Sequence, residues 1–121
     1  AAMKSAWGTS RFAKQANNLF GQWCFTKGCG LVPKQRGKGL KHEVKKFKSV
    51  DQAIAAYFLN INSHPTYALT RETRSKMRAN GETPTGYALV IGLENYSARG
   101  HAYIEELRSI IRVNRLDILY P

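Results

Sequence analysis

The sequence predicts a mainly α fold with a small β-hairpin lobe, arranged as one domain over residues 1–121. The first half of the chain holds two short segments rich in aromatic or alternating apolar residues, separated by a stretch rich in Gly, Pro and Lys. The second half carries apolar residues at helical spacing between helix start and stop signals. A length of 121 residues suits a single compact domain, and a hydrophobic fraction of 43% is enough for an ordinary core.

The N-terminal segments are expected to be short helical pieces. Ala1–Trp7 has the character of the tail of a helix that ends at Gly8, because glycine is the usual residue just past a helix end. Ser10–Asn18 is expected to form another short turn of helix.

The strand candidates are Gly21–Thr26 and Glu43–Lys48. The intervening stretch, Lys27–Lys41, is rich in Gly, Pro and Lys and predicts a loop or an irregular hairpin tip. These segments make up the expected β lobe.

The first long helix is expected to begin near Ser49. Ser49 and Gln52 have the spacing of a capping box, in which each side chain satisfies a backbone N–H at the start of the helix. The residues that follow place an apolar face at helical spacing, formed by Ile54, Tyr57, Phe58 and Ile61.

The remaining segments also predict helices. Pro65 is expected to start a helix that runs to about Ala79 and is closed by Asn80 and Gly81. The sequence GYALVIGL predicts a short helix, and Arg99–Asn114 is amphipathic. We find no internal repeat and no linker that would divide the chain into domains.

The charge of the chain is strongly positive. There are 19 Lys and Arg against 8 Asp and Glu, a formal net charge of +11, and the basic residues cluster in Lys34–Lys48. Such a surface favours polyanions as partners, whether nucleic acid, anionic lipid or the acidic polymers of a bacterial wall. The alternative is a solvated basic loop without a specific partner. No apolar run is long enough to span a membrane.

Cys24 and Cys29 lie close together in WCFTKGCG. A short-loop disulfide and two separate buried thiols are both consistent with this spacing. A metal site is not expected, because the histidines are scattered along the chain, at His42, His64 and His101. No nucleotide or flavin motif is present, so no cofactor is expected.

The segment KSAWGTSRFAKQANNLFGQWCFTKGCG resembles the bacterial glucosaminidase family, which includes the flagellar peptidoglycan hydrolases. In that family a catalytic Glu precedes a Ser-x-Trp-Gly-Thr-Ser-x-Phe segment, and Asn-Leu-Phe-Gly follows. WCFTKGCG is similar to the Bax-type branch in particular. KFKSVDQAIAAYFLNINSHPTY and LENYSARGHAYIEELRSII resemble the later segments of the same family. The residues that match the two motifs are Ser5, Trp7, Gly8, Thr9, Ser10 and Phe12, then Asn18, Leu19, Phe20 and Gly21.

The resemblance implies a lysozyme-like α+β fold and a glycoside hydrolase of the mannosyl-glycoprotein endo-beta-N-acetylglucosaminidase type. The position of the catalytic acid is held by Lys4. The second carboxylate of the family lies in the β lobe, where this chain has Glu43. The alternative for Glu43 is a strand residue paired with a neighbouring Lys. Glu94 and Tyr96 are the other candidates at the site. Tyr96 matches a family tyrosine thought to line the cleavage site, where its hydroxyl is expected to position water or a substrate amide; the alternative is a buried structural tyrosine.

The resemblance also suggests substrate contacts, at Trp7, Phe20, Gln22, Trp23 and Tyr67. It implies peptidoglycan glycan strands as the partner and a location in the bacterial periplasm or cell envelope. The family domain has one or more helices ahead of its catalytic Glu, so we expect this chain to lack them. Because general acid catalysis is lost with Lys4, the prediction is an impaired peptidoglycan hydrolase. The alternatives are a glycan-binding pseudoenzyme and, with charge as its only support, a nucleic-acid-binding protein.

Overall fold

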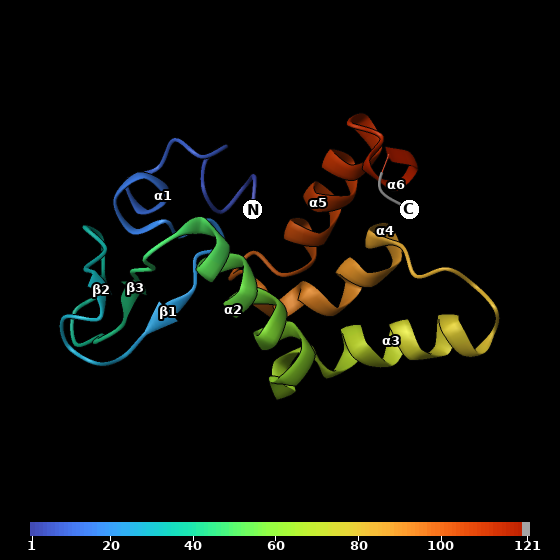
Figure 1. Ribbon diagram of the computed structural model, residues 1–121, viewed down its shortest axis with the longest axis horizontal. Helices are drawn as coiled ribbons and strands as arrows, with labels where there is room; N and C mark the ends of the chain where they lie inside the picture. The colour runs from blue at the N-terminus through green and yellow to red at the C-terminus, as the bar shows by residue number, and fades with distance from the viewer. Residues whose placement is uncertain (120–121) are drawn as a thin grey trace. The chain divides into compact units, whose positions relative to one another are not determined.

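The computed structural model describes residues 1–119, which divide into two compact units (Figure 1). Unit 1 is Ala1–Leu59 and unit 2 is Asn60–Pro121, so the boundary falls within helix α2, Val50–Ser63. Both predicted classes of structure are present: several helices, and a small antiparallel sheet within unit 1. The predicted fold class is therefore confirmed.

Unit 1 begins with a series of turns, and here the sequence-based prediction differs from the structure. Residues 2–9 form turns, whereas a helix tail ending at Gly8 was expected. The chain reverses at Ala6 and Trp7, whose φ angles are +50° and +55°, and the Trp7 N–H donates to the Ala2 carbonyl at 2.8 Å. This is the pairing pattern of a helix C-terminus, formed before the glycine is reached.

The first helix, α1, spans Arg11–Ala16, within the predicted Ser10–Asn18. Ser10 caps it, because its Oγ accepts a hydrogen bond from the Ala13 N–H at 3.1 Å. Asn17 ends it in the left-handed conformation, at φ +52°.

The sheet has three strands in the order β1-β3-β2: β1 is Trp23–Cys24, β2 is Gly30–Leu31 and β3 is Glu43–Lys45. Both pairings are antiparallel, with Trp23 opposite Val44 and Leu31 opposite Val44 on the other side. The predicted strand segments contain β1 and β3, but β2 lies in the stretch that was expected to be a loop. Gly30 permits this pairing, since a Cβ at its position would lie 1.9 Å from the Val44 carbonyl oxygen.

Helix α2 starts with the predicted capping box. Ser49 Oγ accepts from the Gln52 N–H at 3.2 Å, while Gln52 Oε1 accepts from the Lys48 N–H at 3.3 Å. The helix packs on unit 1 through Ala53, which is fully buried. The buried apolar residues of unit 1 are Ala13, Ala16, Val44, Phe47 and Ala53.

In the described part of unit 2, the regular secondary structure consists of helices joined by loops. The predicted helix at Pro65 begins with a 3-10 turn, η1 (Pro65–Tyr67), and continues as α3 (Ala68–Ala79). The predicted short helix divides into α4 (Gly86–Leu89) and the 3-10 helix η2 (Val90–Tyr96). The amphipathic segment is α5 (His101–Val113), and α6 (Leu116–Leu119) follows it without having been predicted.

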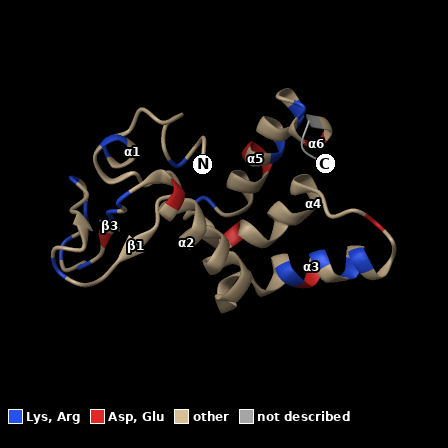
Figure 2. Cartoon of the chain, viewed as in Figure 1, with Lys and Arg blue, Asp and Glu red and all other residues tan. Residues whose placement is uncertain are grey.

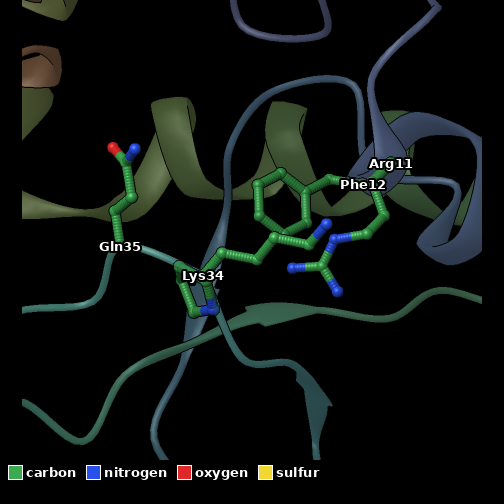
Figure 3. Close-up of a pocket in the computed structure, with 5 residues that line it drawn as sticks. Arg11, Phe12, Lys34 and Gln35 are labelled. Carbon is green, nitrogen blue, oxygen red and sulfur yellow. The ribbon is translucent and has the colours of Figure 1, made fainter.

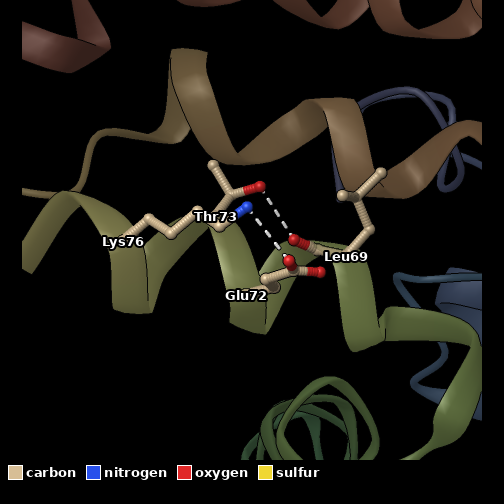
Figure 4. Close-up of polar contacts among 4 residues, drawn as sticks. All are labelled: Leu69, Glu72, Thr73 and Lys76. Carbon is tan, nitrogen blue, oxygen red and sulfur yellow. Dashed lines mark hydrogen bonds and ion pairs between the residues drawn. The ribbon is translucent and has the colours of Figure 1, made fainter.

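The interior of unit 2 forms where η2 crosses α3 and α5. Gly92 packs against Thr70 so closely that a Cβ at Gly92 would lie 2.5 Å from the Thr70 nitrogen. The solvent side of α3 is polar: Thr73 donates to the Leu69 carbonyl at 2.8 Å, and Lys76 pairs with Glu72 at 3.0 Å (Figure 4). The buried residues of unit 2 are Tyr67, Thr70, Val90, Gly92, Tyr103 and Ile104.

Within residues 1–119, no helix is both long enough and apolar enough to cross a membrane.

Candidate active site

The segment around Lys4 is a turn braced by its own backbone and by Ser5. Ser5 is buried and its Oγ accepts from the Gly8 N–H at 2.9 Å. Lys4 is half-buried and its side chain runs along Gly21, where an added Cβ would lie 3.6 Å from Lys4 Cδ. The turn therefore places position 4 beside the residues that precede β1.

Asn18 holds those residues in place. It is 1% exposed, and its amide group makes four hydrogen bonds. Nδ2 donates to the carbonyls of Gln22 and Lys45, both at 2.9 Å. Oδ1 accepts from the N–H groups of Phe20 at 3.3 Å and Gln22 at 3.2 Å. The buried amide thus ties the Phe20–Gln22 loop to the strand that carries Lys45.

The predicted substrate-binding residues of unit 1 differ in exposure. Phe20 is half-buried and stacks flat on Tyr57, with ring centroids 4.0 Å apart, so one ring face is already covered. Gln22 Oε1 is buried and accepts no hydrogen bond within the described part of the chain. Trp7 is 69% exposed.

Trp23 is the aromatic residue best placed for a ligand in this unit. It is 57% exposed and stacks on the His42 imidazole, with centroids 3.8 Å apart. The Phe25 ring, also exposed, lies edge-on to it at 6.4 Å. An exposed aromatic ring of this kind suits stacking with a flat apolar partner such as a sugar ring.

Glu43 is buried, with 5% of its surface exposed, and both carboxylate oxygens are occupied. Oε2 accepts from the Gly28 N–H at 2.9 Å, and Oε1 accepts from the Gly30 N–H at 3.0 Å. These two hydrogen bonds, more than the nearby charges of Arg36 and Lys27, hold the pKa of Glu43 below its usual value. The carboxylate is ionised at neutral pH.

The turn whose Gly28 and Gly30 N–H groups bind Glu43 is closed by a disulfide between Cys24 and Cys29, whose Cα atoms are 6.3 Å apart. Glu43 lies opposite Cys24 in the β1–β3 pairing. The hydrogen bonds from the Gly28 and Gly30 N–H groups therefore support a structural role for Glu43. The sequence had suggested a neighbouring Lys as the structural partner, whereas the partners in the fold are these backbone N–H groups. Its catalytic role stays a prediction.

In unit 2, Tyr67 and Tyr96 lie together. Their ring centroids are 6.1 Å apart, and Tyr103 lies 6.2 Å from Tyr96 on a nearly parallel plane. Tyr67 and Tyr103 are buried, and burial raises the pKa of both phenols, so they keep their protons at neutral pH. Tyr96 is half-buried at the end of η2 and is the more accessible of the three.

The structure thus brings the predicted residues together in two groups, each within its own unit. Lys4 joins Phe20 and Gln22 through Gly21, and Tyr96 joins Tyr67. Sequence reasoning missed four residues that support these groups: Asn18 as a buried hub, Tyr57, His42 and Tyr103. The Asn-Leu-Phe-Gly motif was a signal for the first, whereas the other three become partners only through folding. Within residues 1–119 no group of His, Cys, Asp or Glu side chains is arranged to hold a metal ion.

Comparison with known proteins agrees with the resemblance noted from the motifs. The Glucosaminidase family, described as mannosyl-glycoprotein endo-beta-N-acetylglucosaminidase, matches residues 1–116. The chain is similar to the protein bax of Escherichia coli (strain K12), with 34% identity over 115 residues. That match covers 95% of this chain and 40% of the relative, so the chain spans less than half the length of that protein. No solved structure matches.

Proposed function

This chain belongs to the glucosaminidase family, and we propose that it acts on peptidoglycan as a hydrolase domain whose cutting of the glycan strand after N-acetylglucosamine is impaired. At the level of the family, the activity is that of a glycosidase and the substrate is a glycan. The observation that carries the proposed impairment is Lys4, which stands where the family resemblance places the catalytic Glu.

The chemistry explains why Lys4 matters. Glycoside hydrolysis requires a protonated carboxyl group that donates to the leaving oxygen, and the transition state resembles an oxocarbenium cation. A lysine ammonium at this position brings a second positive charge towards that cation. General acid catalysis contributes about 10²–10⁴-fold, and this contribution is the part that Lys4 removes.

Glu43, the carboxyl group that the family resemblance assigns to this site, does not replace the missing acid. It is held ionised by the Gly28 and Gly30 N–H groups, so at neutral pH it has no proton to donate. An ionised carboxylate suits the other role, as base or stabiliser of the oxocarbenium ion, which is the role that the family resemblance assigns to it. Tyr96 keeps its proposed role of positioning water or a substrate amide.

Features suited to glycan binding are present even without the acid. The exposed faces of Trp23 and Phe25 suit stacking with sugar rings, and Trp7 adds a third exposed aromatic side chain. These residues favour the alternative function, a glycan-binding pseudoenzyme that holds the strand without cutting it. The disulfide is consistent with the proposed location, the bacterial periplasm or cell envelope.

The deciding experiment measures reducing sugars released from purified peptidoglycan by the chain and by its Lys4→Glu variant. The matched control is Lys14→Glu, which makes the same charge change at an exposed position of α1. We expect the Lys4→Glu variant alone to gain turnover, by at least about 100-fold.

The other outcomes separate the candidate functions. If both variants bind peptidoglycan and neither cuts it, the binding function replaces the hydrolase. If Lys14→Glu gains as much as Lys4→Glu, the effect comes from overall charge and the role of position 4 is refuted. Loss of all binding in folded protein would reject both candidate functions.

A further inference from the structure

Unit 1 contains a pocket that none of the predicted site residues line. Its volume is about 420 Å³, and it lies between the start of α1 and the segment that follows β2 (Figure 3). A volume of this size falls within the usual range for ligand pockets, about 300–1,000 Å³. Its lining residues are Arg11, Phe12, Pro33, Lys34 and Gln35.

The Arg11 guanidinium is held in position. Its Nη2 donates to the Val32 carbonyl at 2.9 Å, and its central carbon lies 4.9 Å from the centre of the Phe12 ring. A guanidinium carries several further N–H donors in a planar fork, which matches the two oxygens of a carboxylate. This hydrogen bond also links Arg11 to the segment that carries Lys34, the second cation of the pocket, because Val32 directly precedes Pro33 and Lys34.

Among the described residues, no acidic side chain lines this pocket. Unit 1 holds eleven of the 19 Lys and Arg residues of the chain, but only two acidic residues, Glu43 and Asp51. Glu43 is already bound by Gly28 and Gly30, and Figure 2 shows how the blue basic positions dominate the segment between β1 and β3. An anionic ligand would therefore not compete with an acidic side chain of the pocket for Arg11 and Lys34.

The pocket combines this charge with apolar walls. The Phe12 and Pro33 rings offer a surface for methyl or methylene groups, whereas the Gln35 side chain points away from Arg11, Phe12 and Lys34 (Figure 3). A phosphate polymer would use only the cations, whereas a short peptide that ends in a carboxylate would use both the cations and the apolar rings.

From these features we propose that the pocket binds a carboxylate of the peptide stems attached to the glycan strands. Arg11 and Lys34 hold the carboxylate, and Phe12 and Pro33 contact the apolar side chain next to it. This inference rests on the proposed function, because it takes peptidoglycan as the substrate. It adds a contact with the peptide portion, apart from the glycan contacts at Trp23.

The test compares binding to intact peptidoglycan with binding to the same material after an amidase has removed its peptide stems and the lactyl carboxylates exposed by this hydrolysis have been converted to methylamides. The variants are Arg11→Gln and Lys34→Gln, and the matched control is Lys14→Gln, an exposed lysine on α1 that does not line the pocket. Since Arg11→Gln also removes the hydrogen bond to Val32, Lys34→Gln provides the test that leaves this contact intact. Circular dichroism and thermal unfolding establish that each variant is folded.

We expect each pocket variant to bind intact peptidoglycan about tenfold more weakly, the factor that corresponds to about 1.4 kcal/mol. Removal of the stems should weaken the unchanged chain to a similar extent and should leave the pocket variants unaffected. Lys14→Gln should bind like the unchanged chain.

Three results would overturn the inference. Equal binding of the unchanged chain to intact and stem-free material would refute the pocket while leaving the glycan function standing. An equal loss in Lys14→Gln, or stronger competition by DNA than by the soluble dipeptide L-Ala-γ-D-Glu, would show a general polyanion surface. Binding to neither form of peptidoglycan would reject the proposed function together with the pocket.

Discussion

Asn18 provides the sharpest test of how this site is held together. Replacing it with Leu keeps a similar volume but removes four hydrogen bonds. The Lys45 carbonyl and the N–H groups of Phe20 and Gln22 lose their partners, whereas the Gln22 carbonyl still accepts from the Lys45 N–H at 2.9 Å. Each buried group left unpaired costs about 1–3 kcal/mol. Because Phe20 and Gln22 are only half-buried, water can reach part of the loop, so we take the lower end for these three groups and expect a loss of about 3 kcal/mol.

Such a loss is large against the total stability of a small domain, about 5–15 kcal/mol. The assay is urea unfolding followed by circular dichroism, with the free energy of unfolding extrapolated to water and the slope compared between variants. Gln15→Leu is the control, because Gln15 is an exposed amide in helix α1, just before the segment that carries Asn18, and its replacement should change stability by less than about 0.5 kcal/mol. A loss below about 1 kcal/mol for Asn18→Leu would show that the loop does not depend on this amide.

Two further predictions concern Glu43 and the close packing in unit 2. The pKa of Glu43 is lowered in the folded chain, so its contribution to stability is complete above the ordinary value of 4.5 and is lost as the pH falls through the folded-state pKa. Glu43→Gln should therefore be less stable at pH 7, and urea unfolding between pH 7 and pH 3 should show the difference shrinking with acid; a constant difference would contradict this. Gly92→Ala should lose at least about 2 kcal/mol, because its Cβ would lie 2.5 Å from the Thr70 nitrogen. In Gly86→Ala the nearest atom is 3.8 Å away, on Ile111, so thermal unfolding should show little change, and equal losses in both variants would refute the packing argument.

The helices of the second half were predictable because their signals are local. The capping box at Ser49 and Gln52, the proline at position 65 and the Asn80–Gly81 ending each act within one or two turns of the chain. The strand β2 could not be found in this way. Gly30 and Leu31 have no strand pattern of their own, and they pair with β3 only because Gly30 allows the Val44 carbonyl to approach.

The N-terminal reversal shows a different limit. A glycine at position 8 is the residue that favours a left-handed conformation, and it does have φ +80°, but the reversal already begins at Ala6 and Trp7. The hydrogen bonds from the Gly8 N–H to Ser5 and from the Trp7 N–H to Ala2 stabilise this less favourable backbone. Propensity alone does not predict a turn that depends on such bonds.

For the site, the motif resemblance located the positions but not their partners. Phe20 meets Tyr57 and Trp23 meets His42, and in each pair the partner comes from a distant segment of the chain. The two interpretations of Glu43 were open for the same reason. A carboxylate on a short strand can serve a substrate or the fold, and only the positions of the Gly28 and Gly30 N–H groups favour the second.

The structure also indicates why Lys4 can be accommodated by this fold. The turn around it is stabilised by backbone bonds and by Ser5, none of which uses the side chain at position 4. The aliphatic part of Lys4 lies along Gly21, which has no side chain to obstruct it. Thermal unfolding of Lys4→Glu beside the unchanged chain measures how far this charge reversal at a half-buried position affects folding. If the two chains unfold at the same temperature, any turnover gained by Lys4→Glu reports on proton donation itself, because the fold around position 4 is then unchanged.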